Sequence, residues 1–156
     1  MALGSVLRHA TSLIFIAPFI DPTDRHQYGD LMKLLATLQS RSVKPLIEIH
    51  RAAWYDSGND KRPRVNEVVA ALKPAIEEVA KTAGLSVDVF LWDDIHDRYL
   101  ITDLVGINLP YGFGTTKAPN AQTTWTRLGR ANRDSVQREF DPAHRLPRYQ
   151  FTVRGT

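Results

Sequence analysis

The stretch SLIFIAPF, residues 12–19, is apolar at both its odd and its even positions. A strand that is covered on both faces, as in the centre of a parallel sheet, has this pattern, whereas a half-exposed strand alternates. A membrane-spanning helix needs about 20 apolar residues, far more than this run contains. Residues 12–19 therefore predict a central strand of an α/β protein.

The residues that follow alternate between helical and strand patterns. In residues 24–39, apolar side chains recur at three- and four-residue steps, which is typical of one face of a helix. A second helix is expected over 66–83, where Asn66 is a suitable N-cap and Gly84 a suitable left-handed C-cap. Pro74 should kink that helix. Further strands are predicted at 44–50, 86–92, 97–102 and 147–154, and a last helix includes 134–140.

This order predicts right-handed crossover connections. The expected fold is α/β, with a mixed, largely parallel sheet flanked by helices. Polar stretches at 51–64 and 106–122 indicate loops, and the second has room for one more short strand. No repeat or linker divides the chain, so we expect one domain over residues 1–156. Its abrupt ends would also suit a piece of a longer protein.

The composition, 43% hydrophobic and 24% charged, is typical of a globular protein. Cysteine is absent, which excludes disulfides and thiolate chemistry and fits a reducing compartment. The N-terminus does not resemble a signal peptide, so a cytoplasmic location is expected. The five histidines show neither HxxxH nor HExxH spacing, so the sequence predicts neither a metal site nor another cofactor.

Charge is unevenly distributed along the chain. Residues 117–156 carry eight Lys/Arg and three Asp/Glu, a net of +5, whereas the whole chain has a net charge of +3. A basic C-terminal quarter suggests an anionic partner such as a phosphate group. A solvated arginine-rich surface explains the same distribution equally well.

The stretch WDDIHDRYLITDLVGI, residues 92–107, places ionisable side chains around a short apolar run. If 97–102 is a strand, His96 and Arg98 emerge on the same face at its start, and Asp103 follows its end. An imidazole can act as a nucleophile or an acid near neutral pH, and a guanidinium can hold a phosphate by two hydrogen bonds. A nearby carboxylate can support the charged imidazole. The set suits phosphoryl transfer without a metal.

Each of these residues also has a structural alternative. The His96 imidazole could be satisfied by a neighbouring aspartate, Arg98 could form an ion pair, and Asp103 could be a turn residue. The aspartates near enough in sequence are Asp88, Asp93, Asp94 and Asp97.

The spacing of His96, Arg98 and Asp103 resembles the HxKx4D motif of the phospholipase D superfamily, with arginine in place of lysine. The predicted order of strands and helices before the histidine fits such a domain. The stretch IHDRYLITDLVGI is also similar to the phospholipase D-like C-terminal domain of MIT-domain proteins, which are thought to bind acidic phospholipid. The resemblance implies a phosphodiesterase, foremost a metal-independent nuclease, in which His96 forms a phosphohistidine, Arg98 holds the phosphate and Asp103 supports the site.

Superfamily enzymes carry two copies of this motif and this chain carries one, so the resemblance implies a homodimer. It also implies a small-residue segment ending in Asn after the motif. Here that region is LPYGFGTTKAPN, in which Thr115 and Asn120 are the candidate substrate contacts. Arginine in place of the family's lysine, and the different small-residue segment, support an alternative. In this alternative the domain is catalytically inactive and binds anionic lipid, nucleic acid or a partner protein. A third possibility is a regulatory or sensor module of a larger protein, for example one acting in defence.

Four further side chains are candidate substrate contacts. Glu48 and His50 share one face at the end of the second predicted strand, where open sheets bind ligands. Arg127 and Arg130, near Trp125, could contact phosphates, although a helix face with one buried tryptophan explains them almost as well. Trp54 and Tyr55 could stack on bases or lipid, but the more common role of such residues is to anchor a loop in the core.

Overall fold

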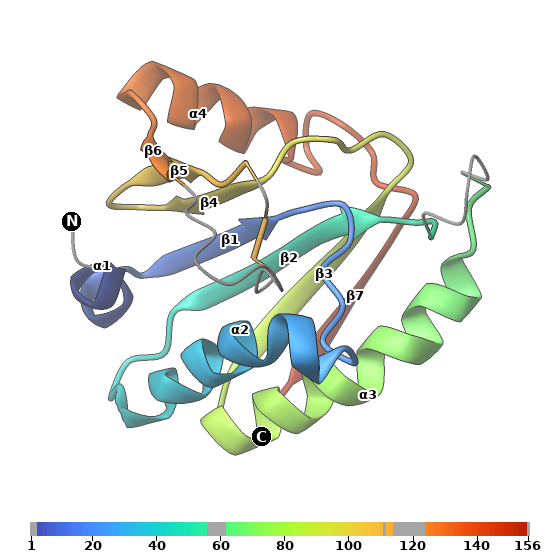
Figure 1. The fold of residues 1–156 in the computed structure, drawn as a ribbon, viewed down its shortest axis with the longest axis horizontal. Coiled ribbons are helices and arrows are strands. Elements are labelled where there is room, and N and C mark those ends of the chain that lie inside the picture. The colour runs from blue at the N-terminus through green and yellow to red at the C-terminus, as the bar shows by residue number, and fades with distance from the viewer. Residues whose placement is uncertain (1–2, 56–61, 111, 114–123, 156) are drawn as a thin grey trace.

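The protein is a single seven-stranded mixed sheet with helices on both faces (Figure 1). The computed structural model describes residues 3–55, 62–110, 112–113 and 124–155 of the chain. The strand order is β6-β5-β4-β1-β2-β3-β7. The strands are β1 (Ser12–Ile16), β2 (Leu46–Ala52), β3 (Ser86–Trp92), β4 (Tyr99–Thr102), β5 (Gly106–Asn108), β6 (Thr126–Arg127) and β7 (Tyr149–Arg154). The α/β class and the mixed sheet predicted from the sequence are confirmed.

Parallel pairing is confined to β1, β2 and β3, and the other strands join antiparallel. The helices α2 (Arg25–Thr37) and α3 (Val65–Ala83) connect these three strands. A 3-10 turn, η1 (Leu38–Ser40), follows α2. β1 lies at the centre, with β2 on one side and β4 on the other, and it is buried along most of its length. The prediction of a doubly covered central strand from residues 12–19 is therefore confirmed.

The helix ends agree only in part with the sequence pattern. Gly84 ends α3 in the left-handed conformation, with φ of 68°, as expected. Asn66 is not the N-cap, because the helix already begins at Val65 and Arg64 occupies the capping position. The other helices are α1 (Leu3–His9), which the sequence analysis missed, and α4 (Arg130–Glu139), which begins four residues before the expected turns.

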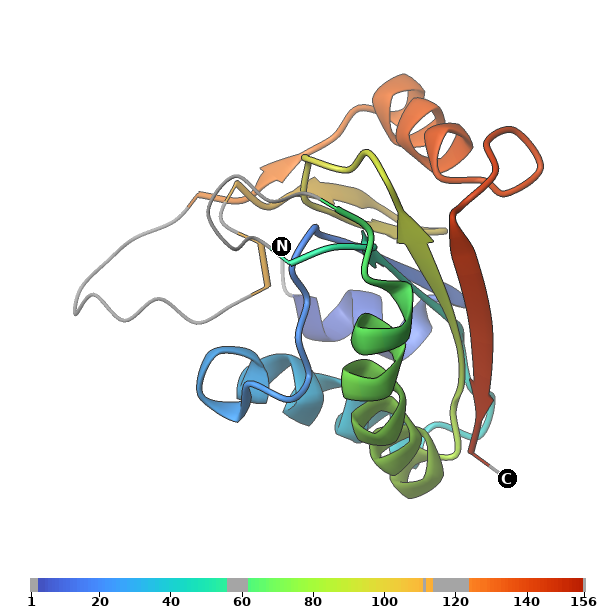
Figure 2. The same ribbon diagram turned by 90° about the vertical axis from the view of Figure 1, so that its right-hand side faces the viewer.

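Two apolar clusters cover the two faces of the sheet. The larger packs α1, α2 and α3 against one face through side chains such as Phe15, Ile49 and Leu100. The smaller packs α4 against the other face and includes Ile16, Trp92 and Phe140. Figure 2 shows α4 above the sheet and α3 beside it. For clarity, these are called the α2/α3 face and the α4 face.

The end of β2 and the start of β4 differ from the prediction, and both differences affect the candidate site. β2 continues through Arg51 and Ala52, which were expected in a loop, and both residues are buried. β4 begins at Tyr99, so His96 and Arg98 precede the strand. His96 and Arg98 therefore lie in the connection between β3 and β4 and not in a strand.

Candidate functional site at the carboxyl edge of the sheet

The connection between β3 and β4, residues 93–98, crosses the carboxyl edge of the parallel strands. It carries His96, whose side chain is two-thirds exposed and whose Nε2 lies 2.7 Å from Oδ1 of Asp94. A carboxylate at this distance can accept a hydrogen bond from the ring N–H and thereby favour one orientation of the ring. The imidazole is therefore oriented by Asp94, the neighbour that the sequence analysis considered only as a structural partner.

His96 and Arg98 project from the same side of this connection. Their neighbours Ile95 and Tyr99 both belong to the cluster beneath α4. Burial raises the pKa of Tyr99, and the charges of Asp97 and of Glu139 in α4 raise it further, so Asp97 also lies toward the α4 face. Alternate residues of an extended segment point in opposite directions. His96 and Arg98 therefore lie on the opposite side, although neither belongs to the strand.

The side chain of Arg98 extends over the α2/α3 face. Burial raises the pKa of Tyr28 in α2, and among the charges that act on this phenol are those of Arg51, Asp21 and Arg98. Gly112, with φ of 75°, packs against the Arg98 chain so closely that a Cβ there would lie 3.0 Å from Cδ. Within the described part of the chain, the Arg98 guanidinium has no carboxylate partner in an ion pair. A cation without a carboxylate partner at this edge can bind an anion.

A second guanidinium, that of Arg51, lies buried beneath this edge and is only 2% exposed. Its three nitrogens donate to the backbone carbonyls of Ala52, Ile20 and Trp54 at 2.9, 2.9 and 3.3 Å. Burial lowers the pKa of Arg51. This residue ties the ends of β1 and β2 together, and its charge, like that of Arg98, acts on the Tyr28 phenol. No sequence pattern pointed to this role, because an arginine in RAAWYD looks like part of a polar loop.

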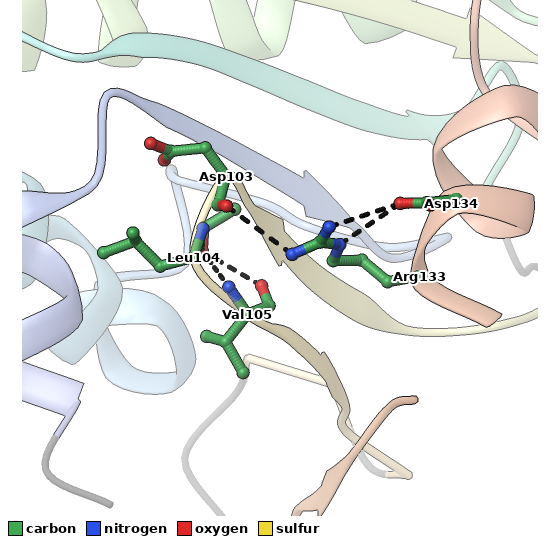
Figure 3. A network of polar contacts seen from close by, with 6 residues as sticks. Asp103, Leu104, Val105, Arg133 and Asp134 are labelled. Carbon is green, nitrogen blue, oxygen red and sulfur yellow. Dashed lines mark hydrogen bonds and ion pairs between the residues drawn. The ribbon is translucent and has the colours of Figure 1, made fainter. Parts of the chain in front are cut away.

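Asp103 does not lie beside His96, and this expectation is wrong. Its carboxylate accepts from the backbone N–H and the hydroxyl of Thr11 at 2.9 and 2.8 Å, and from the N–H of Ser12 at 3.2 Å. These residues start β1, at the opposite end of β4, so Asp103 is about 16 Å along the strand from Arg98. Figure 3 shows the carboxylate pointing away from Arg133, whose guanidinium lies against the Asp103 carbonyl. Asp103 thus fixes the start of β1.

Glu48 and His50 share a face as predicted, but they do not line the carboxyl-edge site. His50 is fully buried on the α4 face, stacked on Phe90 with ring centroids 4.6 Å apart. Its Nε2 lies 2.8 Å from Oε2 of Glu48, and its Nδ1 accepts from Trp92. The sequence pattern could not show that α4 covers this part of β2. The pair is part of the packing beneath α4.

Trp125, just before β6, and Arg127, within β6, lie on the face of the sheet that carries Arg98. The ladders pair Arg127 with Ile107, and Ile107 with Leu100, so these residues lie on the same face of the sheet. Continuing this register places Trp125, which is 47% exposed, two strands from Arg98, or about 10 Å. Arg130 lies at the exposed start of α4. Thr115 and Asn120 lie outside the described residues.

The aromatic pair at the end of β2 packs rather than binds. Trp54 is buried, its ring contacts Phe19 edge to face, and its indole N–H donates to the Asp93 carbonyl at 3.2 Å. Tyr55 is partly buried and lies near Arg51, 5.6 Å from its guanidinium. These residues hold the β2 end in place, which is the more common role considered for them.

The chain matches no protein-family model, and no curated protein is similar to it in sequence. Among the described residues, no helix is both long and apolar enough to cross a membrane. The same residues contain no group of three or more His, Asp or Glu side chains arranged to hold a metal ion. The candidate site is therefore defined by its own geometry. His96 lies against Asp94, and the charges of Arg98 and Arg51 both act on Tyr28. Trp125 and Arg127 lie on the face that carries Arg98.

Proposed function

We propose that this protein is a phospholipase D-like phosphodiesterase that acts on nucleic acid at the carboxyl edge of its sheet. The observation that carries the proposal is the exposed His96 imidazole, which lies 2.7 Å from Asp94. Alternation along residues 95–99 places the Arg98 guanidinium on the same side of the chain. An imidazole supported by a carboxylate is suited to nucleophilic attack, and an adjacent guanidinium is suited to the phosphate oxygens.

In the proposed reaction, the ring nitrogen of His96 that is not bound to Asp94 attacks phosphorus. The bond from phosphorus to the leaving oxygen breaks, and a phosphohistidine forms. Arg98 neutralises charge on the nonbridging oxygens, and Asp94 stabilises the cationic ring. Water then attacks the phosphorus of the intermediate, which releases the phosphorylated product and restores the imidazole. Asp94 takes the supporting role that the sequence analysis gave to Asp103.

The leaving oxygen needs a proton, and one histidine cannot easily be both nucleophile and acid. We therefore propose that the active form is a homodimer in which a second His96 supplies that proton. Because the mechanism uses only side chains, no metal or other cofactor is required. Cleavage should continue in the presence of EDTA.

Nucleic acid is the proposed substrate class because an aromatic and a cationic side chain lie on the same face as Arg98. Trp125 can stack on a base and Arg127 can contact a phosphate, which are the two kinds of contact that single-stranded nucleic acid uses. A separation of about 10 Å between Trp125 and Arg98 would suit a nucleic-acid backbone that crosses β4, β5 and β6.

The test is cleavage of single-stranded DNA and RNA in EDTA, with vesicles of acidic phospholipid as the alternative substrate. His96→Ala should abolish cleavage, and Asp94→Asn should reduce it, because the His96 ring loses the carboxylate that orients it and supports its cationic form. Arg98→Lys restores the residue that the family motif has and should retain activity. His144→Ala removes an exposed histidine elsewhere and serves as the control. Cleavage that survives in His96→Ala would refute the proposal.

A second candidate function is binding without cleavage. It is favoured by the position of Asp103, which serves the start of β1 and leaves the motif one carboxylate short at the site. Under this alternative the domain binds the phosphates of an anionic partner through Arg98 and turns nothing over. Cleavage by the unmodified protein distinguishes the two. Under this alternative the unmodified protein should bind a labelled oligonucleotide without cleaving it, His96→Ala should bind it equally well, and Arg98→Ala should bind it weakly.

A further inference from the structure

β7 is an edge strand of the sheet, and one side of its backbone has no partner strand among the described residues. Its six residues run antiparallel to β3, from Leu91 opposite Tyr149 to Ser86 opposite Arg154. Figure 2 shows β7 along one border of the sheet, with α3 against one of its faces. An edge with unpaired N–H and C=O groups is a template for another strand.

The hydrogen bonds show which residues of β7 face outward. The Ala53 N–H donates to the Trp92 carbonyl at 2.9 Å, so the even-numbered residues of β3 direct their backbone groups toward β2 and the odd-numbered ones toward β7. The Gly155 N–H donates to the Leu85 carbonyl at 2.8 Å, so the odd-numbered residues of β7 bond to β3. The outward residues are therefore Gln150, Thr152 and Arg154.

β7 has only part of the usual protection of an edge strand. Natural sheets protect edges with charged side chains, proline, bulges or very short strands. Tyr149–Arg154 is as long as an average strand, contains no proline or lysine, and has one charged residue, Arg154. Tyr149 is 44% exposed, and Leu146 before it is 89% exposed. The opposite edge, β6, has two residues. The two edges thus differ, and only β7 offers a continuous template.

We infer that β7 pairs with β7 of a second copy of this chain, antiparallel and about a two-fold axis at Thr152. In this register Thr152 lies opposite Thr152 of the other copy, and Gln150 lies opposite Arg154. Each of the outward residues carries one donor and one acceptor, and all of them are then paired. No like charges lie opposite each other, because Arg154 of one copy lies opposite the amide side chain of Gln150 in the other.

The sequence of β7 favours this register over its neighbours. A shift of the two-fold axis to Phe151 would place Arg154 opposite Arg148, a cation that already forms an ion pair with Asp93. A shift to Val153 would leave Gln150 outside the ladder. With the axis at Thr152, Phe151 lies opposite Val153 on the α2/α3 face, and aromatic–β-branched pairs of this kind stabilise antiparallel strands.

This contact does not rest on the proposed function. Because both copies of β7 run antiparallel to each other, the β3 strands of the two copies also run in opposite directions, and their carboxyl edges lie at opposite ends of the joined sheet. The two His96 side chains therefore do not meet in this dimer. Loss of either contact can be detected without loss of the other.

The first test removes one outward N–H and leaves the β3 ladder intact. Thr152→Pro deletes the donor at the proposed two-fold axis, and proline is tolerated on an edge strand where the N–H is not used internally. Thr152→Val is the matched control, because both variants lose the 2.5 Å hydrogen bond from the Thr152 hydroxyl to Asp88 and only the proline loses the N–H. Sedimentation across a range of concentrations should show one dimerisation step that the unmodified chain and Thr152→Val share and that Thr152→Pro has lost, with an unchanged circular dichroism spectrum.

The second test checks the register through charge. Gln150→Glu places a carboxylate opposite Arg154 of the other copy, and Gln150→Lys places a cation there. Because each substitution acts twice in a symmetric dimer, the dimer dissociation constant should fall with glutamate and rise with lysine, by about two- to thirty-fold in each direction. Added salt should reduce both effects.

Three results would overturn the inference. A chain that remains monomeric at millimolar concentration has no such contact. A dimer that is unaffected by Thr152→Pro forms through another surface, such as the one that brings two His96 residues together. A monomer that instead binds a short extended peptide, with loss of that binding in Thr152→Pro, uses this edge for a different partner.

Discussion

The indole N–H of Trp92 donates to Nδ1 of His50 across 3.0 Å, and Nε2 of the same ring lies 2.8 Å from the Glu48 carboxylate. With Nδ1 accepting, the proton of the neutral ring must be on Nε2, where it is donated to Glu48. A second proton would put two donors face to face at Nδ1. This fully buried imidazole is therefore held in one tautomer and in its neutral form.

The neutral state of His50 predicts a pH dependence of stability. Burial lowers the pKa of His50 from its ordinary value of 6.5, and the hydrogen bond to Glu48 opposes this only in part. Below pH 6.5 the unfolded chain takes up a proton that the folded protein does not, so stability falls as pH falls, by up to about 1.4 kcal/mol per pH unit. Urea unfolding at pH 7.5 and 5.5 measures this slope. His50→Gln should flatten it, whereas His144→Gln should not. Equal slopes in both variants would contradict the assignment.

Asp103 should contribute to stability and not to any activity. Partial burial acts to raise its pKa, but the hydrogen bonds from Thr11 and Ser12 outweigh this and lower the pKa below the ordinary 3.8. The contribution is therefore present above pH 3.8 and lost as pH falls through the lower value. Asp103→Asn should cost about 1 kcal/mol in the free energy of unfolding, because the site is exposed.

A double-mutant cycle tests the partner of Asp103. Thr11→Val removes the hydroxyl that lies 2.8 Å from the carboxylate. Its cost should be smaller in the Asp103→Asn background than in the unmodified protein, because the two changes disrupt one interaction. Additive costs would show that the contact contributes nothing. Loss of catalysis or binding in Asp103→Asn, with a stable fold, would return Asp103 to the functional site.

Arg51 should resist even the conservative replacement. Its guanidinium reaches three carbonyls that lie in different directions, and a lysine ammonium on a single chain end cannot contact all of them. Arg51→Lys should lower the free energy of unfolding by roughly 2–4 kcal/mol, because buried carbonyls lose their donors. Chemical denaturation measures the loss. Arg130→Lys, at an exposed position in α4, is the control and should change stability by less than about 0.5 kcal/mol.

Gly112→Ala should weaken phosphate binding. The position has φ of 75°, which disfavours alanine, and the added Cβ would lie 3.0 Å from Arg98 Cδ and 3.3 Å from Nε. The guanidinium should be displaced, which raises the dissociation constant for an oligonucleotide by several-fold. Gly29→Ala, in α2, adds a Cβ into open space and should leave binding unchanged while slightly stabilising the helix. Equal affinity of the two variants would show that Arg98 does not contact the ligand.

The sequence predicted the sheet better than it predicted the site. Residues 12–19, 86–92 and 147–154 show strand patterns because each face of a strand must match its surroundings, and this is a local signal. The position of Asp103 was missed because the motif spacing shows only that it follows a short strand, and the distance along that strand separates it from His96. Arg51 was missed because its partners are carbonyls of other segments, which no side-chain pattern records.

The central place of β1 has a consequence for synthesis of the chain. Residues 12–16 pair with 99–102 on one side of the sheet, so one flank of the most apolar strand stays open until more than eighty further residues have been added. At a translation rate of about 5–20 residues per second, that interval lasts several seconds. Until its fourth strand leaves the ribosome, the nascent chain therefore exposes an unpaired strand edge, which is a site for aggregation.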